Sequence, residues 1–533
     1  MGVIAPKTDV YLLKVPLEID NTNQLTFSNA TAQYNYFNSL PKMGFDTDFT
    51  YQRKDGVIRI PALIDDIITF NYVMYKNENH SNKWFYAYID KMEYINDSMT
   101  AVSISTDVWQ TWQFSLNYKP TFIEREHVNN DAIGLHTIPE GLECGEYVVN
   151  STQTLQPDKT VKDHDNHAIN WKLPIVFQVT GITNVLIDAQ NYYNSEINGI
   201  FSGLYYFGVT SLSDARAIVR TYNADQNGNK IEAIFLAPKE FFNGAYAVSG
   251  GGMTIYVPAN TSTLSTLLDT TTITRPSKLN GYTPKNNKLF TYPYSYLYIT
   301  NNTGIDTEFR YEDFKDATPK FYMAGALSQG CSTKLCPVDY KGILNMEAFE
   351  YGVTGSKYPI CAWATDYYTS WITQNAVNVN LGMASSVLNT ASNFLSGNVT
   401  GTANSLLGGV GGVMSQIQSA KAHPDQANGN TNTGDLLVGW QRYFTADCMS
   451  VRSEIAETID KFFSMFGYKV NTVKTPNITG RRNWNYVKTL GCYIEADIPQ
   501  EDLQVIKEMF NNGVTFWHNA STFADYNQNN DII

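Results

Sequence analysis

The sequence predicts a β-rich α+β protein made mostly of antiparallel sheets. Short runs that alternate apolar and polar residues, bounded by Asn, Asp and Gly, occur near both ends of the chain. Aromatic side chains, which strands favour, are abundant, with 35 Tyr and 27 Phe. Charged residues make up only 17%, against roughly 25% in ordinary soluble domains. At 533 residues the chain is too long for one core, so we expect several domains.

Residues 1–149 are expected to form an N-terminal β-rich domain. Two short helices, Asn29–Leu40 and Val108–Phe114, should begin at the capping residues Asn29 and Asp107. A Lys-Asp-Gly turn should join two of the strands as a hairpin. The expected strands are Val10–Pro16, Asp48–Arg53, Val57–Ile60, Trp84–Tyr94, Thr100–Thr106 and Thr121–Glu126.

Residues 150–290 are expected to form a middle β domain, although their pattern is less regular. Ile175–Thr180 and Ala233–Leu236 are its clearest strands. Gly250–Gly252 and the Thr-rich stretch Thr261–Thr274 have the composition of loops or linkers.

Residues 291–366 and 435–533 are expected to form a C-terminal α+β domain. Its later part has the order strand, helix, strand, strand, helix, strand, which is the split βαβ arrangement of ferredoxin-like domains. Gly467 should end the first helix. The expected elements are Gly439–Thr445, Ser450–Phe466, Tyr468–Lys474, Trp484–Ile494, Glu501–Phe510 and Val514–Trp517.

Between these two parts, residues 367–434 form a predicted hydrophobic loop insertion. Tyr367–Ala420 is 54 residues long and contains no Asp, Glu, Lys, Arg or His. The average composition of the chain would place about nine charged residues there. Two stretches have apolar residues at helical spacing, but neither reaches the ~18 residues of an ordinary membrane-spanning helix.

Three interpretations of this insertion are open on residue patterns alone. Several copies could bury apolar helix faces in lipid while polar faces meet one another. The stretches could instead form a helical hairpin packed in an oligomer, or a flexible Gly/Ser/Asn loop. In the membrane interpretation, the lipid-contacting side chains are Val377, Leu381, Met383, Val387, Leu388, Phe394, Leu395, Leu406, Leu407, Val410, Val413, Met414 and Ile417.

No catalytic, cofactor-binding or metal-binding site is predicted, so we expect a protein that is not an enzyme. The common nucleophile, phosphate-loop and zinc-protease motifs do not occur in the sequence. Lys162–His167 carries two His and two Asp that could bind a metal, but a solvated loop is the favoured interpretation. Charges in Glu124–His127 favour a salt-bridge ladder over acid–base chemistry. Cys331 and Cys336 lack the second ligand pair of a zinc site, and the sequence leaves open whether they pair with each other.

The net charge of −13 argues against a nucleic-acid-binding surface, which needs clustered Lys and Arg. The first residues lack the apolar run of a signal peptide, so we expect synthesis and folding in a cytoplasm and exit by a route such as lysis.

Several long strings at both ends resemble the tail knob (distal tail tube) proteins of Picovirinae-type short-tailed bacteriophages. At the N-terminal end they are Asn82–Tyr88 (NKWFYAY), Asp107–Trp112 (DVWQTW), Phe122–Val128 (FIEREHV) and Glu140–Leu142 (EGL). At the C-terminal end they are Phe466–Asn471 (FGYKVN), Asn485-Tyr486, Cys492 and Asn512–His518 (NGVTFWH). The resemblance covers residues 8–150 and 435–520 well and the middle only loosely.

This resemblance implies antiparallel, tube-forming β domains assembled as a homohexamer at the distal end of the virion tail. It implies that hydrophobic loops plug the tube and later penetrate the host cell membrane during infection, forming a pore that conducts DNA. The implied partners are a proximal tail or lower collar protein, host membrane lipids, double-stranded DNA passing without specific binding, and a tail-tip wall hydrolase. No cofactor is implied. Only Tyr367–Ala420 can be the loop, and its residues match the family in character but not in sequence.

Two other functions remain as alternatives. A receptor-binding or cell-wall-binding tail module would suit the Tyr-rich, weakly charged middle region. A wall-degrading enzyme is less favoured, because no catalytic arrangement is visible in the sequence.

Overall fold

The computed structural model describes residues 8–45, 56–77, 82–170, 173–182, 196–197, 200–201, 203–224, 230–259, 265–343, 349–359, 363–364, 427–428 and 443–533. The chain divides into two compact units. The first unit comprises Met1–Gly145, Gly281–Pro293 and Ser453–Ile533, and the second comprises Glu146–Asn280 and Tyr294–Arg452. These units do not follow the expected segments 1–149, 150–290, 291–366 with 435–533, and 367–434, because strands far apart in sequence pair with each other. The predicted β-rich character is confirmed.

The first unit contains a six-stranded antiparallel sheet in the order β3-β1-β5-β6-β7-β4. Apolar side chains are buried on both of its faces, with Val10 and Ile58 on one and Phe37 and Tyr72 on the other. The expected hairpin partner of β4, Asp48–Arg53, lies outside the described residues, and β4 pairs with β7. The strands are β1 (Thr8–Leu13), β3 (Lys42–Phe45), β4 (Val57–Ile60), β5 (Tyr72–Asn77), β6 (Trp84–Asn96) and β7 (Met99–Thr106).

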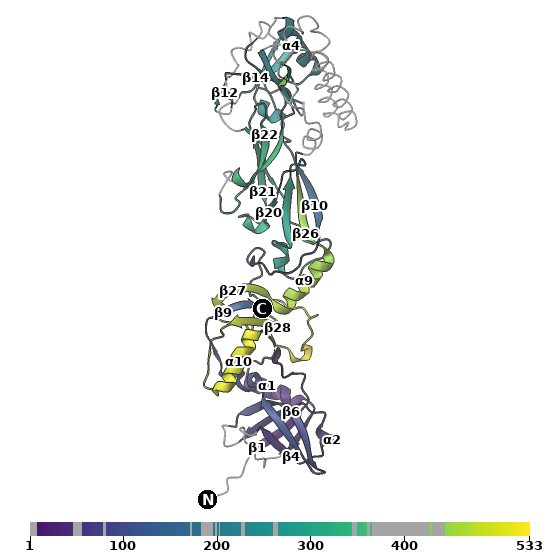
Figure 1. Cartoon of the computed structure of the whole chain (residues 1–533), viewed down its shortest axis with the longest axis vertical. Coiled ribbons are helices and arrows are strands. Elements are labelled where there is room, and N and C mark those ends of the chain that lie inside the picture. The colour runs from purple at the N-terminus through teal and green to yellow at the C-terminus, as the bar shows by residue number, and fades with distance from the viewer. Residues whose placement is uncertain are drawn as a thin grey trace. The chain divides into compact units, whose positions relative to one another are not determined.

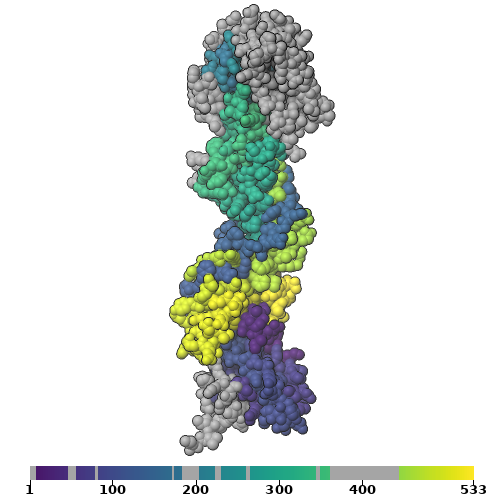
Figure 2. All heavy atoms as spheres, in the orientation of Figure 1, coloured from purple at the N-terminus to yellow at the C-terminus, as the bar shows by residue number. Residues whose placement is uncertain are grey.

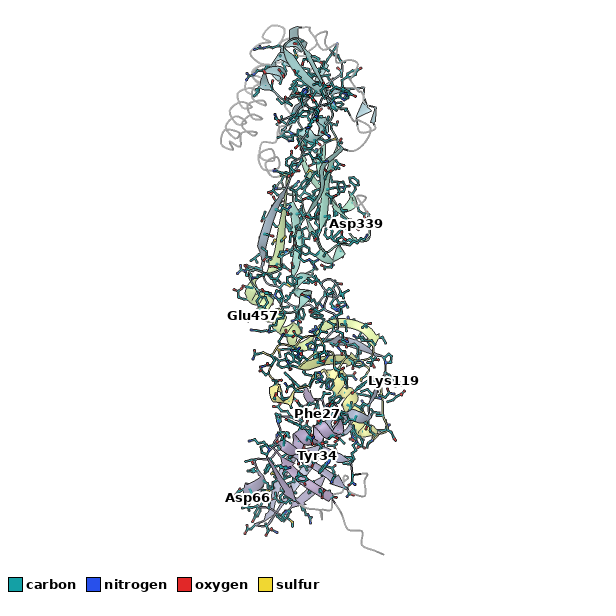
Figure 3. The ribbon with its side chains drawn as sticks, turned by 180° about the vertical axis from the view of Figure 1, so that it is seen from behind. Phe27, Tyr34, Asp66, Lys119, Asp339 and Glu457 are labelled. Carbon is teal, nitrogen blue, oxygen red and sulfur yellow. The ribbon has the colours of Figure 1, made fainter. Side chains whose placement is uncertain are left out.

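Three short helices accompany this sheet: α1 (Ala30–Ser39), α2 (Ile64–Ile67) and α3 (Val108–Trp112). Both predicted caps are confirmed. Asn29 Oδ1 accepts a hydrogen bond from Ala32 N at 2.8 Å, and Asp107 Oδ1 accepts one from Gln110 N at 3.0 Å. Phe27 lies beside α1, which carries Tyr34 (Figure 3), and its ring is 6.0 Å from that of Phe37.

A second sheet of the first unit has the order β2-β30-β28-β9-β27 and joins the two ends of the chain. Figure 2 shows atoms of the early chain, in blue, among those of the C-terminal segment, in yellow. Helices α9 (Ser453–Phe466) and α10 (Gln500–Asn512) belong to this unit, and Gly467, with φ +64°, follows α9 as predicted. The strands are β2 (Asn23–Leu25), β9 (Thr121–Glu126), β27 (Tyr468–Lys474), β28 (Trp484–Leu490) and β30 (Val514–Trp517), with β8 (Asn117–Tyr118) paired to β29 (Ile494–Glu495) alongside.

The expected ferredoxin-like unit does not form. Its intended first strand, observed as β26 (Phe444–Val451), belongs to the second unit and pairs there with β10 and β19. Strand β9 instead lies between β28 and β27. Hydrophobic alternation located β9, β27 and β30 correctly, whereas β26 extends to Val451, six residues past the expected end at Thr445. Such a pattern carries no information about which distant strand pairs with which in a sheet.

The second unit contains three larger sheets around one apolar core. The first has the order β10-β26-β19-β20, with β10 (Tyr147–Leu155), β19 (Ser295–Thr300) and β20 (Asp306–Phe309). The second has the order β15-β11-β14-β17-β16, with β11 (Ile175–Val179), β14 (Tyr205–Val209), β15 (Ile231–Leu236), β16 (Tyr246–Gly250) and β17 (Met253–Val257), accompanied by α4 (Leu212–Ala224). The third has the order β18-β21-β22-β23, with β18 (Ser265–Thr272), β21 (Lys320–Gly325), β22 (Ser332–Val338) and β23 (Val353–Lys357). Two short strands, β12 (Glu196–Ile197) and β13 (Ile200–Phe201), also pair.

Of the two stretches expected to be loops or linkers, the glycine run contains a turn and most of the Thr-rich run forms a strand. Gly251 and Gly252, with φ of +61° and +79°, form the two-residue turn of the β16–β17 hairpin. Residues 265–272 of the Thr-rich stretch form strand β18, whose Leu267 and Leu268 are buried. Threonine is β-branched and fits a pleated strand well, so its abundance there indicated a strand more than a linker.

Candidate functional site at the base of the uncharged segment

All thirteen predicted membrane-contacting residues lie outside the described residues, within 365–426. The structure does describe where the chain leaves for that segment and where it returns. Strand β24 (Trp363–Ala364) pairs antiparallel with β25 (Ala427–Asn428), with Trp363 opposite Asn428 and Ala364 opposite Ala427. The chain therefore leaves the described residues and returns to them at neighbouring positions.

Before it leaves, the chain is held by Tyr358 and Pro359, directly after β23. Tyr358 N donates to Cys331 O at 2.9 Å, and Leu236 N donates to Pro359 O at 2.9 Å. These two bonds connect the departing chain to the ends of β22 and β15. The described base of the insertion is thus tied to two different sheets.

Aromatic packing strengthens this attachment. The Tyr358 ring is stacked on Phe235 at a centroid distance of 6.1 Å and meets Phe241 edge-on at 6.0 Å. Tyr358 is 2% exposed. Aromatic pairs at such distances contribute about 0.5–1.5 kcal/mol beyond burial. Gly325 makes room for the arrangement, since a Cβ there would lie 3.0 Å from Tyr358 Oη.

The returning chain re-enters the core at Tyr443 and Phe444, which are both buried. Tyr443 has φ +51°, a left-handed conformation that is unusual for a bulky side chain. Phe444 then opens β26, where it lies opposite Leu155 of β10. Backbone strain of this kind costs on the order of 1–3 kcal/mol and persists only where surrounding contacts enforce it.

Glu240 is the ionisable acidic side chain where the uncharged segment joins the second unit. It lies in the 3-10 turn η4 (Lys239–Phe242), is 7% exposed, and its Oε1 has no hydrogen-bond partner. Burial raises the pKa of Glu240 to about 7, an effect only partly offset by a hydrogen bond from its own backbone and by Lys239 and Lys159. Burial also raises the pKa of Tyr443, and the nearby Glu240 carboxyl raises it further. We define Glu240, Tyr358, Tyr443, Phe235 and Phe241 as the base cluster.

The other sequence candidates have structural roles. In Glu124–His127 the ladder is confirmed: Glu124 Oε2 is 3.0 Å from Lys488 Nζ, Arg125 pairs with Glu140, and Glu126 pairs with Lys474. His127 Nδ1 accepts a bond from Tyr486 N at 2.7 Å, and Nε2 lies 3.1 Å from Ser464 O. With both ring nitrogens engaged by the backbone, His127 has no lone pair left for proton transfer.

In the loop Lys162–His167, Asp163 binds its own loop. Its Oδ1 accepts from His167 N at 2.8 Å, and Oδ2 lies 3.2 Å from His167 Nδ1. No group of three or more His, Cys, Asp or Glu able to hold a metal occurs among the described residues. Cys331 and Cys336 do not form a disulfide.

In the described ranges no helix is both long enough and apolar enough to cross a membrane. The first unit has a polar cavity of about 260 Å³, lined in part by Asp131, Lys285, Asn287, Arg481 and Asn529. The lining has no net charge, because the cationic Lys285 and Arg481 are balanced by the anionic Asp131 and Asp531.

Comparison with known proteins identifies the family. Residues 257–531, about half of the chain, match the family model described as Bacillus phage phi29, Tail knob protein gp9, C-terminal domain. The chain belongs to the phi29-type tail knob family. Residues 6–117 also match the model of the Caudoviral major tail protein N-terminus.

Relatives within this family match along nearly the whole chain. Tail knob protein gp9 of Bacillus phage phi29 is 25% identical over 98% of this chain and 98% of its own. The tail knob proteins of Bacillus phages PZA and B103 are similar to the same extent. The structure of the bacteriophage C1 tail knob protein gp12 has a similar fold, with a TM-score of 0.65, 15% identity, and coverage of 99% of this chain and 100% of that one.

This tail knob family member is therefore a structural component of a short-tailed phage virion, and the predicted resemblance is confirmed. The uncharged segment was evident from composition. The base cluster was not, because Glu240 and Phe241 lie more than a hundred residues before Tyr358 and two hundred before Tyr443. A Lys-Glu-Phe-Phe string beside a proline gives no sign that its carboxyl will be buried.

Proposed function

We propose that this chain forms a homohexameric tube at the distal end of the tail, through which the genome is ejected. The uncharged segment plugs the tube before infection, then penetrates the host cell membrane and forms a pore that conducts DNA. A proximal tail or lower collar protein and a tail-tip wall hydrolase are the proposed virion partners.

One observation carries the membrane part of the proposal: Tyr367–Ala420 contains no charged residue, and the residues around it pair as β24 and β25. A pair of flanking strands lets a long segment leave and return without disturbing the core of the second unit. Charged side chains cost about 2.5–3.5 kcal/mol each in the bilayer centre, so their absence over 54 residues favours lipid contact.

The acidic balance of the chain supports the passage of DNA. With a net charge of −13, the protein offers few cations to retain phosphates. Double-stranded DNA is thus proposed to slide through the tube without specific binding.

Dye release from liposomes tests the membrane step. The full chain should release dye, and deletion of 383–414 should abolish release while leaving the described units folded. Leu388→Lys with Val410→Lys should lose most of the release, because the lysines fall on the predicted lipid-facing residues. The matched control, Ser386→Lys with Gln416→Lys, adds the same charge at polar positions and should retain more. Equal release by the deletion and the full chain would overturn the membrane role.

Negative-stain imaging tests assembly. A sixfold ring is expected for the purified chain, and a population consisting only of monomers would contradict the tube.

A second candidate function, a receptor-binding or cell-wall-binding tail module, is favoured by the polar cavity of the first unit. Its amide and charged lining with no net charge would suit hydroxyl-rich ligands. Tight retention of the chain on purified host wall material would support this function, whereas a protein that only forms a tube should wash off.

A further inference from the structure

We propose that Glu240 is a proton-controlled latch at the base of the uncharged segment: the base cluster is tight when the carboxyl is neutral and loosens when it is ionised. This inference deepens the proposed function by naming a regulator of the same site. It stands on contacts of the described residues alone.

The position of η4 makes Glu240 central to the second unit. Its two phenylalanines pack on different sheets. A Cβ on Gly208 of β14 would lie 2.5 Å from the Phe242 ring, and a Cβ on Gly325 of β21 would lie 3.2 Å from the Phe241 ring. Glu240 directly precedes these two residues in η4, so its carboxyl is held where the two sheets meet.

The carboxyl has little compensation there. Oε1 has no partner, and what favours the ionised form is a hydrogen bond from the backbone of Glu240 itself, the adjacent Lys239 and the more distant Lys159. Lys159 Nζ is engaged elsewhere, 2.8 Å from Asp269 Oδ1, and Asp158 adds a like charge. Among the described residues, the titratable groups that act on Glu240 are thus Lys239, Lys159, Asp158 and Tyr443. An ionised carboxylate in this position must regain water, and separation of the surrounding side chains supplies it.

The side chains most affected are those that hold the insertion. Tyr443 faces Glu240 and is already in a left-handed backbone conformation. Tyr358 packs on Phe241, the residue after Glu240. Hydration of the carboxylate therefore acts on both the departing and the returning chain.

The direction with pH follows from the raised pKa of Glu240. In the closed base cluster the Glu240 carboxyl stays neutral up to about pH 7. In the opened cluster the carboxyl is exposed and has its ordinary pKa of about 4.5. Opening thus becomes easier as pH rises above 4.5, and the effect levels off above 7. Acid tightens this latch.

Hydrogen–deuterium exchange of the full chain, without lipid, tests the latch. After correction for intrinsic exchange, residues 443–451 and 231–243 should open roughly tenfold to thirtyfold more at pH 8.5 than at pH 5.5. Glu240→Gln should abolish that ratio. Glu308→Gln, at an exposed position on β20 of the same unit, should preserve it. Residues 306–309 of β20, the strand that carries the Glu308 control, serve as an internal reference.

A pH-independent wild-type ratio, or an unchanged ratio in Glu240→Gln, overturns the latch. If the Gln variant fails to fold, two wild-type measurements decide. They are the pH dependence of exchange and a carboxylic-acid infrared band that should disappear near pH 7. Failure of dye release with a normal exchange ratio would contradict only the proposed membrane role. Normal dye release with a flat ratio would contradict only the latch.

Discussion

Two buried glutamates, one in each unit, differ in whether their carboxylates have charged partners. In the first unit, the Glu140 side chain is fully buried, pairs with Arg125 and Lys288, and accepts a bond from Lys469 N at 2.9 Å. In the second, Glu240 is buried with one carboxylate oxygen lacking a partner. A buried charge that is paired fixes chain segments, whereas one that is unpaired makes stability depend on protonation.

The difference has a structural reason. Glu140 joins three stretches that are distant in sequence: β9 through Arg125, the 281–293 segment through Lys288, and the start of β27 through Lys469. Burial lowers the pKa of Lys288, and the Glu140 carboxylate opposes that shift. Glu240 forms no such ion pair within the described residues, so the cost of its burial is only partly offset.

The largest expected effect comes from breaking the paired site. Glu140→Ala should destabilise the first unit by about 3–5 kcal/mol, because it leaves Lys288 and Arg125 buried without a counter-ion. Native-state hydrogen exchange in strand β28 measures this loss of stability. The double variant Glu140→Leu with Lys288→Met should lose less than the single one. A larger loss in the double variant would show that the ion pair is not what holds the segments.

The unpaired site should respond with the opposite sign. Glu240→Gln should stabilise the second unit by about 1–3 kcal/mol at pH 8.5 and by little at pH 5, since it removes a charge that the fold disfavours. Urea unfolding monitored by exchange in β26 checks this result. A loss of stability at pH 8.5 would mean that the carboxylate has a favourable role in the closed state.

The two units should also differ in their response to acid through His127. Burial, with nearby Arg481 and Arg125, lowers the pKa of His127 to about 3 from an ordinary 6.5. The unfolded chain binds the proton first, so this residue costs the first unit stability as pH falls from about 6.5 toward 3.

Between pH 7.5 and 5 the loss attributable to His127 is expected to be about 1–2 kcal/mol. His127→Gln should reduce the acid sensitivity measured in β28, while the response of β26 stays as in the wild type. An identical pH slope in the variant would refute the assignment to His127.

The smallest effect is expected at the exposed end of the same ladder. Glu124 and Lys488 are 3.0 Å apart with side chains 41% and 35% exposed, so Glu124→Ala should cost only about 0–1 kcal/mol. Its cost should shrink further in high salt, whereas that of Glu140→Ala should not. A cost as large as that of Glu140→Ala would remove the distinction between buried and exposed pairs.

Local sequence determined the elements where a cap or a sharp period was present. Asn29 and Asp107 begin their helices, Gly467 follows α9, and β4, β9, β27 and β30 have the bounds that were predicted. The predicted division into domains could not include a sheet that combines β9 with β27, β28 and β30, because pairing depends on contacts over more than 300 residues. The lipid-facing residues within 365–426 stay a prediction.

By itself, the sequence determined the β-rich class, the absence of charge over Tyr367–Ala420 and the resemblance to phage tail knob proteins. Composition and contiguous strings are visible in the sequence without any knowledge of the fold. Only the tertiary structure decided that β24 and β25 pair at the base of that segment. It alone decided that Glu240 is buried beside Tyr443 and that Glu140 is buried among cations. Burial and pairing are properties of neighbours in space, and for these two glutamates the neighbours lie far away in the chain.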